Sequence, residues 1–304
     1  MRLLHLGNLV IDLVLTVGDL PERGGDVIAS STATAAGGGF NVMAAAVRQG
    51  LPTLYAGAHG SGPFGSQARV ALEEAGVELL HPAREDLDTG FVVTLVDASG
   101  ERTFVTSRGA EATLTSEDLP DPVDGRDLVY LSGYSLLHDS NRAALIPWLG
   151  AISPDVPVFF DPGPLVAEIP EAALEAVFAR ADWWSCNAAE ATAVTGLAEP
   201  LEAARSLVRR TGHADVLVRT GAAGCFLAVR GAEVQHIEGF AVEAVDLNGA
   251  GDTHSGTFLA GIADGEEPAE AARRANAAAA LAVTRRGPAT SPTRDELEAY
   301  LRGR

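Results

Sequence analysis

The sequence predicts an α/β protein with a three-layer α/β/α core, a mostly parallel central sheet and a small inserted β-sheet. Short β-branched or aromatic runs alternate with longer Ala-rich stretches, as expected when helices connect parallel strands. Two segments, 13–35 and 89–106, break this alternation, because they show period-two apolar patterning with no helical stretch between their strands. With 304 residues, 47% of them hydrophobic and 21% charged, the chain is long enough to bury a sizeable core.

The elements of the core follow from these runs in chain order. Strands are predicted where apolar, β-branched or aromatic residues form short runs between turn residues. Their ranges are 2–11, 53–57, 127–132, 156–161, 182–185, 215–219, 224–229 and 234–236. Helices are predicted over the longer Ala-rich stretches that connect these runs. Their ranges are 41–49, 64–75, 140–151, 171–180, 187–195, 199–211, 252–264, 268–286 and 293–301.

The two exceptional segments are interpreted as an insertion into one core domain. The core then comprises residues 1–12, 36–88 and 107–304, and the inserted sheet comprises residues 13–35 and 89–106. The tetrapeptide Asp97-Ala98-Ser99-Gly100 supplies a turn within the second segment. A sheet too small to cover both of its own faces must pack against something, and a ligand pocket or a second subunit would serve. We therefore expect the insertion to act as a lid.

The charge balance excludes several classes of function. The chain has 22 basic and 41 acidic side chains, a net charge of −19, so it lacks the clustered Lys and Arg that nucleic-acid binding needs. The apolar N-terminal run is interrupted by His5, Asn8 and Asp12, which favours a strand over a signal peptide. No stretch approaches the roughly 20 apolar residues of a membrane span. Two cysteines, Cys186 and Cys225, are too few for a disulfide scaffold and indicate a reducing compartment. Together with the lack of a spanning stretch, this leads us to expect a cytoplasmic location and no membrane partner.

The segment from Asp246 to Gly256, with the sequence DLNGAGDTHSG, carries the most informative pattern. Gly249 and Gly251 admit backbone conformations that other residues avoid, and a helix starting near Asp252 leaves its first N–H groups without intrahelical partners. Gly249, Ala250 and Gly251 are therefore predicted to form an anion hole for a phosphoryl group. The segment lacks both the Lys-Ser/Thr ending of a P-loop and the third glycine of a dinucleotide fingerprint.

Asp252 places a carboxylate at the mouth of this anion hole. There it could accept the proton of an attacking hydroxyl. A helix N-terminus favours the ionised form of a carboxyl group, so we expect Asp252 to be a ready acceptor but a weak base. The alternative is that Asp252 simply caps its helix.

A second glycine-rich turn, Gly37-Gly38-Gly39, precedes Asn41 and a helix. Glycines let a backbone approach a small ligand closely, and the Asn41 amide both donates and accepts hydrogen bonds, which suits hydroxyl recognition. The alternative is a tight turn capped by Asn41. Asp12, near the end of the first strand, could bind two hydroxyls of a polyol or could be a turn former.

Asn187 and Glu190 open a helix after a predicted strand. Their i, i+3 spacing puts both side chains on one face, near the edge where open α/β sheets bind ligands. Glu190 could orient a water of a hydrated Mg²⁺, because magnesium usually keeps several waters in proteins. The alternative is a capping box, which has the same spacing.

Taken together, these stretches resemble the ribokinase (phosphofructokinase B type, PfkB) family of carbohydrate kinases. Residues 37–50 are similar to its N-terminal signature and residues 246–261 to its C-terminal signature, with Asn187-x-x-Glu190 and Thr220-Gly221-Ala222-Ala223-Gly224 in order between them. The resemblance runs from Gly7 to about Gly287. It implies a ribokinase-like fold and an ATP-dependent transfer of the γ-phosphate to a hydroxymethyl group of a sugar or sugar derivative.

The resemblance also implies roles for individual residues. Asp252 is then the base, and residues 249–252 form the anion hole. The acceptor side comprises Asn8, Asp12, Gly38, Gly39 and Asn41, to which Phe104 and Arg108 are added as candidate contacts. The nucleotide side comprises Asn187, Thr220, Gly221, Gly224 and Asn276, with Mg²⁺ near Glu190. The inserted strands supply a lid that in many members also forms a homodimer interface.

The sequence departs from the family pattern at three places. His254 replaces the Phe common after the catalytic Asp, and we interpret it as a packing residue rather than a proton shuttle. Asn248 stands where Thr is frequent, which bears on the monovalent cation, K⁺, that some members bind near Asp246. Residues 131–134 lack the Glu that ribokinases place near the sugar, which argues against ribose as the acceptor.

Three alternatives remain open at this stage. A nucleoside kinase of the same family is the nearest, since Phe104, Tyr134 and Phe40 could stack on a base. A sugar or nucleotide sensor with the same fold and no turnover is the second, although Asp252 and its glycines speak against it. A Rossmann dehydrogenase is the third, and binding of NAD would be its signature.

Overall fold

The computed structural model describes residues 1–121 and 123–303, which form two β-sheets. The larger sheet has nine strands in the order β13-β12-β11-β10-β9-β8-β1-β4-β5. Their bounds are β1 Arg2–His5, β4 Thr53–Tyr55, β5 Glu78–Leu79, β8 Asp127–Ser132, β9 Val158–Asp161, β10 Trp183–Asn187, β11 Asp215–Arg219, β12 Gly224–Ala228 and β13 Gln235–Glu238. The strands from β11 to β5 are parallel, and β12 and β13 are antiparallel additions. The sheet is mostly parallel, as the sequence predicts.

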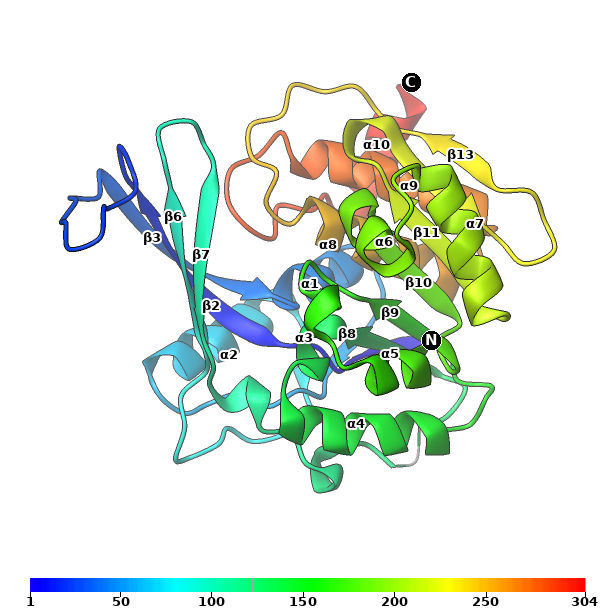
Figure 1. Ribbon diagram of the computed structural model, residues 1–304, viewed down its shortest axis with the longest axis horizontal. Coiled ribbons are helices and arrows are strands. Elements are labelled where there is room, and N and C mark those ends of the chain that lie inside the picture. The colour runs from blue at the N-terminus through cyan, green and yellow to red at the C-terminus, as the bar shows by residue number, and fades with distance from the viewer. Residues whose placement is uncertain (122, 304) are drawn as a thin grey trace.

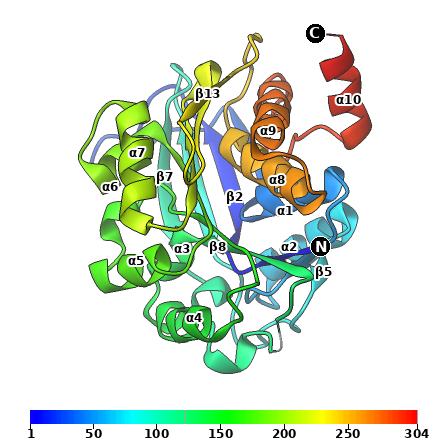
Figure 2. The ribbon, with the colours of Figure 1, turned by 90° about the vertical axis from the view of Figure 1, so that its right-hand side faces the viewer.

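Helices cover both faces of this sheet and complete three layers (Figure 2). One layer contains α1 Phe40–Arg48, α8 Ala250–Ala263 and α9 Pro268–Ala282, with α10 Arg294–Arg302 packed outside α9. The other contains α3 Gly133–Leu136, α4 Asp139–Ala151, α5 Glu171–Phe178, α6 Ala188–Thr195 and α7 Pro200–Thr211. Successive strand residues alternate between the layers, so Trp183 packs against α8 while Trp184 packs against Phe178 of α5.

Short 3₁₀ helices connect some of these elements. None of the described helices has the length and apolar character to cross a bilayer. The 3₁₀ bounds are η1 Ala110–Ala112, η2 Ser116–Asp118, η3 Val166–Glu168 and η4 Gly221–Ala223.

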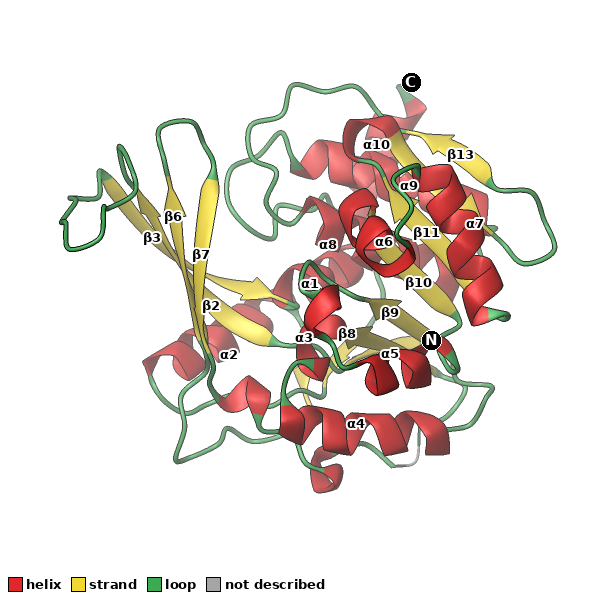
Figure 3. Ribbon diagram, viewed as in Figure 1, coloured by secondary structure: helices red, strands yellow, loops and turns green. Residues whose placement is uncertain are grey.

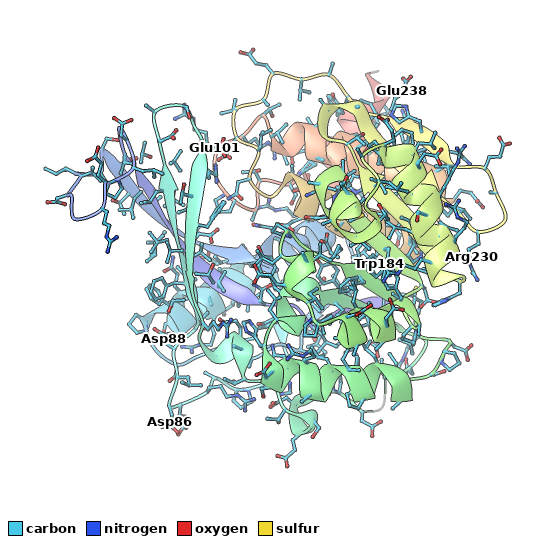
Figure 4. The ribbon with its side chains drawn as sticks, in the orientation of Figure 1. Asp86, Asp88, Glu101, Trp184, Arg230 and Glu238 are labelled. Atoms are coloured by element: carbon cyan, nitrogen blue, oxygen red, sulfur yellow. The ribbon has the colours of Figure 1, made fainter. Side chains whose placement is uncertain are left out.

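The smaller sheet projects from the three-layer body (Figures 1 and 3). Its order is β3-β2-β6-β7, with β2 Leu9–Thr16, β3 Ser31–Gly38, β6 Phe91–Val96 and β7 Arg102–Ser107. Its β2–β6 pair is parallel and its other two pairs are antiparallel. The base of the sheet rests on α2 (Pro63–Ala75), and Asp88 just before β6 accepts the N–H groups of Phe64 and Gly65 in the first turn of that helix (Figure 4).

The predicted single strand 2–11 is wrong, because the chain turns at Gly7 and divides it between the two sheets. A Cβ at Gly7 would lie 2.4 Å from Cε1 of the buried His5, and the Gly7 N–H is bonded to Nδ1 of that ring. Continuous apolar patterning runs across this break, so the sequence pattern hides it. The turn places Asn8 and Asp12 at the junction of the two sheets.

Two very short elements, β5 and α3, are absent from the sequence-based prediction. The division of the chain into core and lid stays a prediction.

Candidate active site

Asp252 lies in the first turn of α8, directly after the glycine turn that begins the helix. The N-cap of α8 is Gly249, whose φ of 71° is in the left-handed region that glycine adopts without strain. Asp252 is therefore inside the helix, and the capping alternative for this residue is wrong. Its carboxylate oxygen Oδ2 accepts a hydrogen bond of 3.1 Å from Nδ2 of Asn41.

Asn41 uses both ends of its amide to join two segments that are far apart in the sequence. It is the second residue of α1 and is buried, while the N-cap of that helix is Gly39, so the capping alternative for Asn41 is also wrong. Its Nδ2 donates to Asp252, and its Oδ1 accepts the N–H of Ala289 at 3.0 Å. Asn41 thereby fixes the orientation of the Asp252 carboxylate.

Small residues bring α1 and α8 close enough for this contact. A Cβ at Gly256 would lie 2.5 Å from the carbonyl oxygen of Val42 and 2.7 Å from Cβ of Ala45, so glycine is needed where the helices cross. Gly256 and Asp252 are one helical turn apart, as are Ala45 and Asn41. The same crossing that packs the helices therefore places Asn41 beside Asp252.

The environment of Asp252 makes it a stronger base than the sequence predicts. The pKa of Asp252 is raised to about 6, chiefly by burial and also by the nearby Asp161 carboxylate, against the lowering effects of Asn41 and Arg219. The expectation of a weak base is thus wrong, because loss of solvent outweighs the favourable field of the helix N-terminus. A pKa near 6 keeps Asp252 ionised at neutral pH and strengthens its capacity to accept a proton.

A buried cation, Arg219, lies beside this turn at the end of β11. A Cβ at Gly251 would lie 3.6 Å from Nε of Arg219. The guanidinium Nη1 donates to Oδ2 of Asp161 at 3.0 Å, to the hydroxyl of Ser185 and to the hydroxyl of Ser255 at 3.2 Å. Burial alone would lower the pKa of Arg219, but Asp161 and Glu190 hold it above its usual range. The arrangement puts a permanent positive charge next to the predicted anion hole.

Glu190 forms a capping box with Asn187, as the structural alternative predicts. Its backbone N–H donates to Oδ1 of Asn187 at 2.9 Å, and its Oε2 accepts the N–H of Asn187 at 2.7 Å. The same Oε2 is 3.6 Å from Nη2 of Arg219, and burial with Asp161 nearby raises the pKa of Glu190. Within residues 1–121 and 123–303, no group of three or more His, Cys, Asp or Glu side chains is arranged to hold a metal ion.

The predicted acceptor residues gather where β2 and β3 meet the body of the protein. Asp12 lies within β2 opposite Ala35, and a Cβ at Gly37 would lie 2.3 Å from its Oδ2, so the glycine leaves room for the carboxylate. The pKa of Asp12 is raised to about 6, because the effect of burial exceeds the lowering effect of Arg102. Gly38 has a φ of 59°, and the N–H of Gly39 donates to the carbonyl of Asn8 at 2.7 Å.

The predicted nucleotide residues lie at the other end of the same sheet edge. Thr220 N–H and Oγ1 both donate to the carbonyl of Gly224, closing a tight turn in which Gly221 and Gly224 have positive φ. Asn276 is buried in α9 and donates from Nδ2 to the carbonyls of Ile237 and Glu238 in β13. Asn276 therefore ties α9 to the edge of the sheet.

Two predicted acceptor contacts lie away from these clusters. Phe104 is 60% exposed on the edge strand β7, and Arg108 is an exposed residue just after that strand. His254, in contrast, is fully enclosed in α8, where burial lowers its pKa to about 3. A neutral buried imidazole agrees with a packing role.

Comparison with known proteins identifies the family. A model described as pfkB family carbohydrate kinase matches residues 2–295. The chain belongs to the pfkB family of carbohydrate kinases. An uncharacterized sugar kinase of Escherichia coli, YegV, is 31% identical to this pfkB kinase over 96% of the present chain and 91% of its own.

Solved structures of ribokinases confirm the predicted fold. Arabidopsis thaliana ribokinase, complexed with ribose and ATP, superimposes with a TM-score of 0.84 at 25% identity and covers 99% of this chain and 98% of its own. A putative ribokinase II of E. coli, in complex with ATP and Mg²⁺, gives a TM-score of 0.86 at 22% identity over 100% and 99% of the two chains. As a pfkB kinase, the protein is a phosphotransferase with an alcohol acceptor.

Sequence reasoning missed two side chains of this pfkB kinase, Asp161 and Arg219. Each is the last residue of a strand of the parallel sheet, at the edge where open α/β folds place their ligands. A search of strand ends for charged residues would have found them. Their mutual pairing joins positions 58 residues apart and needs the strand order β9-β10-β11.

Proposed function

We propose that this pfkB kinase transfers the γ-phosphate of ATP to a hydroxymethyl group of a sugar or sugar derivative. The observation that carries the proposal is the Asp252 carboxylate, oriented by Asn41 and given a pKa near 6, at a glycine turn that opens a helix. A base at this position stands beside N–H groups that stabilise negative charge.

The proposed reaction uses these groups in one step. Asp252 accepts the proton of the primary hydroxyl while the hydroxyl oxygen forms a bond to the γ-phosphorus. The bond from that phosphorus to the β,γ-bridging oxygen breaks, and ADP leaves with the electron pair. The N–H groups of residues 249–251 and the helix dipole stabilise the charge of the transferring group, for which the N–H of Ala250 gives up its long, 3.4 Å hydrogen bond to the carbonyl of Leu247. Arg219 adds a positive charge beside this turn.

Substrate positions follow from the two clusters. We place the sugar hydroxyls against Asp12, Asn8, Gly38 and Gly39, next to Asn41, because the glycines leave room and the polar groups converge there. We place the nucleotide along the Thr220–Gly224 turn, with Asn187 and Asn276 at its margins. Phe104 and Arg108 then contact the acceptor when the small sheet closes as a lid.

Mg²⁺ fits this site through water. Glu190 and Asp161 are the nearby carboxylates, and both face Arg219, so direct coordination by several carboxylates is disfavoured while ordering of metal-bound waters is allowed. A bound Mg²⁺ would neutralise phosphate charge. The monovalent cation near Asp246 stays a prediction. The homodimer through the small sheet also stays a prediction, and Val105 of that sheet is 61% exposed beside Phe104.

The test is an acceptor panel. Purified protein is incubated with Mg·ATP and single sugars, sugar acids, sugar phosphates or nucleosides, and phosphorylated product is identified by mass spectrometry. We expect product on a primary alcohol of a sugar derivative. Product on nucleosides alone would favour the nucleoside kinase alternative, and tight binding of ATP and sugar without product from any acceptor would favour the sensor.

The pH profile of kcat/KM supplies a further prediction. Asp252 accepts a proton only when ionised, and its raised pKa means that the ionised fraction falls as the pH drops through about 6. We expect kcat/KM to be half-maximal near pH 6 on the acid side. Rates measured from pH 5 to pH 8 in buffers of constant ionic strength check this prediction. The acid limb of the profile is the part in which kcat/KM falls with decreasing pH, and a midpoint of this limb close to pH 4, where an exposed Asp titrates, would contradict the prediction.

A further inference from the structure

An ion pair joins the small sheet to the loop that precedes α8. Arg102 is the first residue of β7, and its Nη2 lies 2.5 Å from Oδ1 of Asp246. The two side chains are 26% and 15% exposed, so the pair is better shielded from water and salt than an ordinary surface pair. Figure 4 labels the preceding residue, Glu101, near the tip of the β6–β7 hairpin.

Asp246 in turn holds two loops through its carboxylate. Its Oδ1 also accepts the N–H of Asn248 at 3.0 Å, and its Oδ2 accepts the N–H of Gly287 at 3.1 Å. The first loop leads directly into Gly249 and α8, and the second follows α9. Both oxygens of Asp246 therefore have donors, and its charge is balanced by the guanidinium of Arg102.

These contacts continue to the proposed base. Two residues after Gly287, the N–H of Ala289 donates to Oδ1 of Asn41, whose Nδ2 donates to Asp252. An ion pair, hydrogen bonds and the short loop segment between Gly287 and Ala289 thus connect β7 to the Asp252 carboxylate. The charge of Arg102 also lowers the pKa of Asp12, the predicted acceptor carboxylate, against the effect of burial.

We propose that Arg102 is a positioning residue of this kinase: its guanidinium holds Asp246, and through Asp246 the loops before α8 and after α9, in the arrangement that phosphoryl transfer needs. The inference rests on the proposed role of Asp252. It also means that the positive charge at Asp246 comes from the protein itself. Arg102 then takes the place of the K⁺ that the family resemblance implies near Asp246, so turnover needs no monovalent cation at this carboxylate. The contact of the small sheet with Asp246 is thereby coupled to order in the glycine turn.

The test compares Arg102→Ala with Arg102→Lys and with a control, Arg205→Ala, which removes an exposed Arg–Glu pair on α7. We measure kcat and KM in KCl and in tetramethylammonium chloride at equal ionic strength. We expect wild type to turn over equally in both salts. Arg102→Ala should lose about 10–100-fold in kcat, the size of effect that misplacing reacting groups produces, with a smaller change in KM. Arg102→Lys should retain most of kcat, and Arg205→Ala all of it.

A second measurement needs no substrate. Amide hydrogen exchange at Asn248 and Gly287 reports whether Asp246 still holds both loops, and we expect faster exchange at both positions in Arg102→Ala than in wild type or Arg205→Ala.

Unchanged exchange at Asn248 and Gly287, unchanged kcat in Arg102→Ala, or a wild type that is active only with K⁺ would each overturn the inference. If no acceptor is phosphorylated by wild type, the proposed function fails, and the exchange result still decides whether Arg102 orders the loops.

Discussion

Replacing Asp252 by Asn is expected to inactivate the kinase while stabilising its fold. Asn has almost the same shape but accepts no proton, so kcat should fall about 10²–10⁴-fold, the usual contribution of a general base. The ionised carboxylate is unfavourable in its buried position, as its pKa near 6 indicates. Removing that charge should raise the free energy of unfolding by about 1–3 kcal/mol at pH 8, since each pKa unit corresponds to about 1.4 kcal/mol and residual solvent reduces the total.

The stabilisation by Asp252→Asn is expected to increase with pH. A carboxyl group whose pKa is raised by folding stabilises the fold in its protonated form, fully below the unfolded pKa of 3.8, and this contribution is lost as the pH rises through about 6. The advantage of Asp252→Asn should therefore be small near pH 4 and complete at pH 8. Urea unfolding at the two pH values measures it, with Asp86→Asn as an exposed control (Figure 4). Equal stability of Asp252→Asn and wild type at pH 8, or substantial residual turnover, would contradict the assignment.

Local patterns in the sequence identified Asp252 and Asn41 but not what they do to each other. Glycines before a helix are visible in the sequence, whereas the pKa of Asp252 depends on its burial in the folded chain and on Asp161, which comes from strand β9. The capping box of Asn187 and Glu190 is local and was read correctly as an alternative. The break at Gly7 was missed, because the apolar run continues across it. Arg102 and Asp246 are 144 residues apart, so their pairing depends on the position of the small sheet.

One side of the candidate site contains several buried charged side chains. Asp161, Glu190, Asp252 and Asp12 bring several carboxyl groups toward one sheet edge, in a chain that is already strongly acidic. Such a site repels a polyphosphate unless cations are present. Arg219 compensates Asp161 and Glu190, and we infer that its removal affects folding and catalysis together.

Replacing Arg219 by Met is expected to have the largest effect on stability. It leaves Asp161 and Glu190 buried without their shared counter-charge, and removing one partner of a buried ion pair costs about 3–5 kcal/mol. The guanidinium also lowers the pKa of Asp252, so its loss should move the acid limb of kcat/KM upward from pH 6. Arg219→Lys keeps the charge but loses the forked geometry, so it should fold better and shift the limb less.

Two further variants separate a structural effect from a catalytic one. Arg180→Met removes a similarly buried arginine paired with Asp182, away from the site, and should lower stability while leaving the acid limb at pH 6. Adding Asp161→Asn to Arg219→Met removes one of the two stranded charges, so it should recover part of the lost stability and return the fall of kcat/KM toward its original pH. If Arg219→Met and Arg180→Met shift the pH profile alike, or the double variant keeps the profile of Arg219→Met, then Arg219 does not set the charge state of Asp252. A double variant no more stable than Arg219→Met would contradict the stranded charge as the cause of the lost stability. We expect the fall of kcat/KM to move to higher pH when Arg219 is lost and back to lower pH when Asp161 is also lost. This result would show that proton acceptance at Asp252 depends on the buried pair.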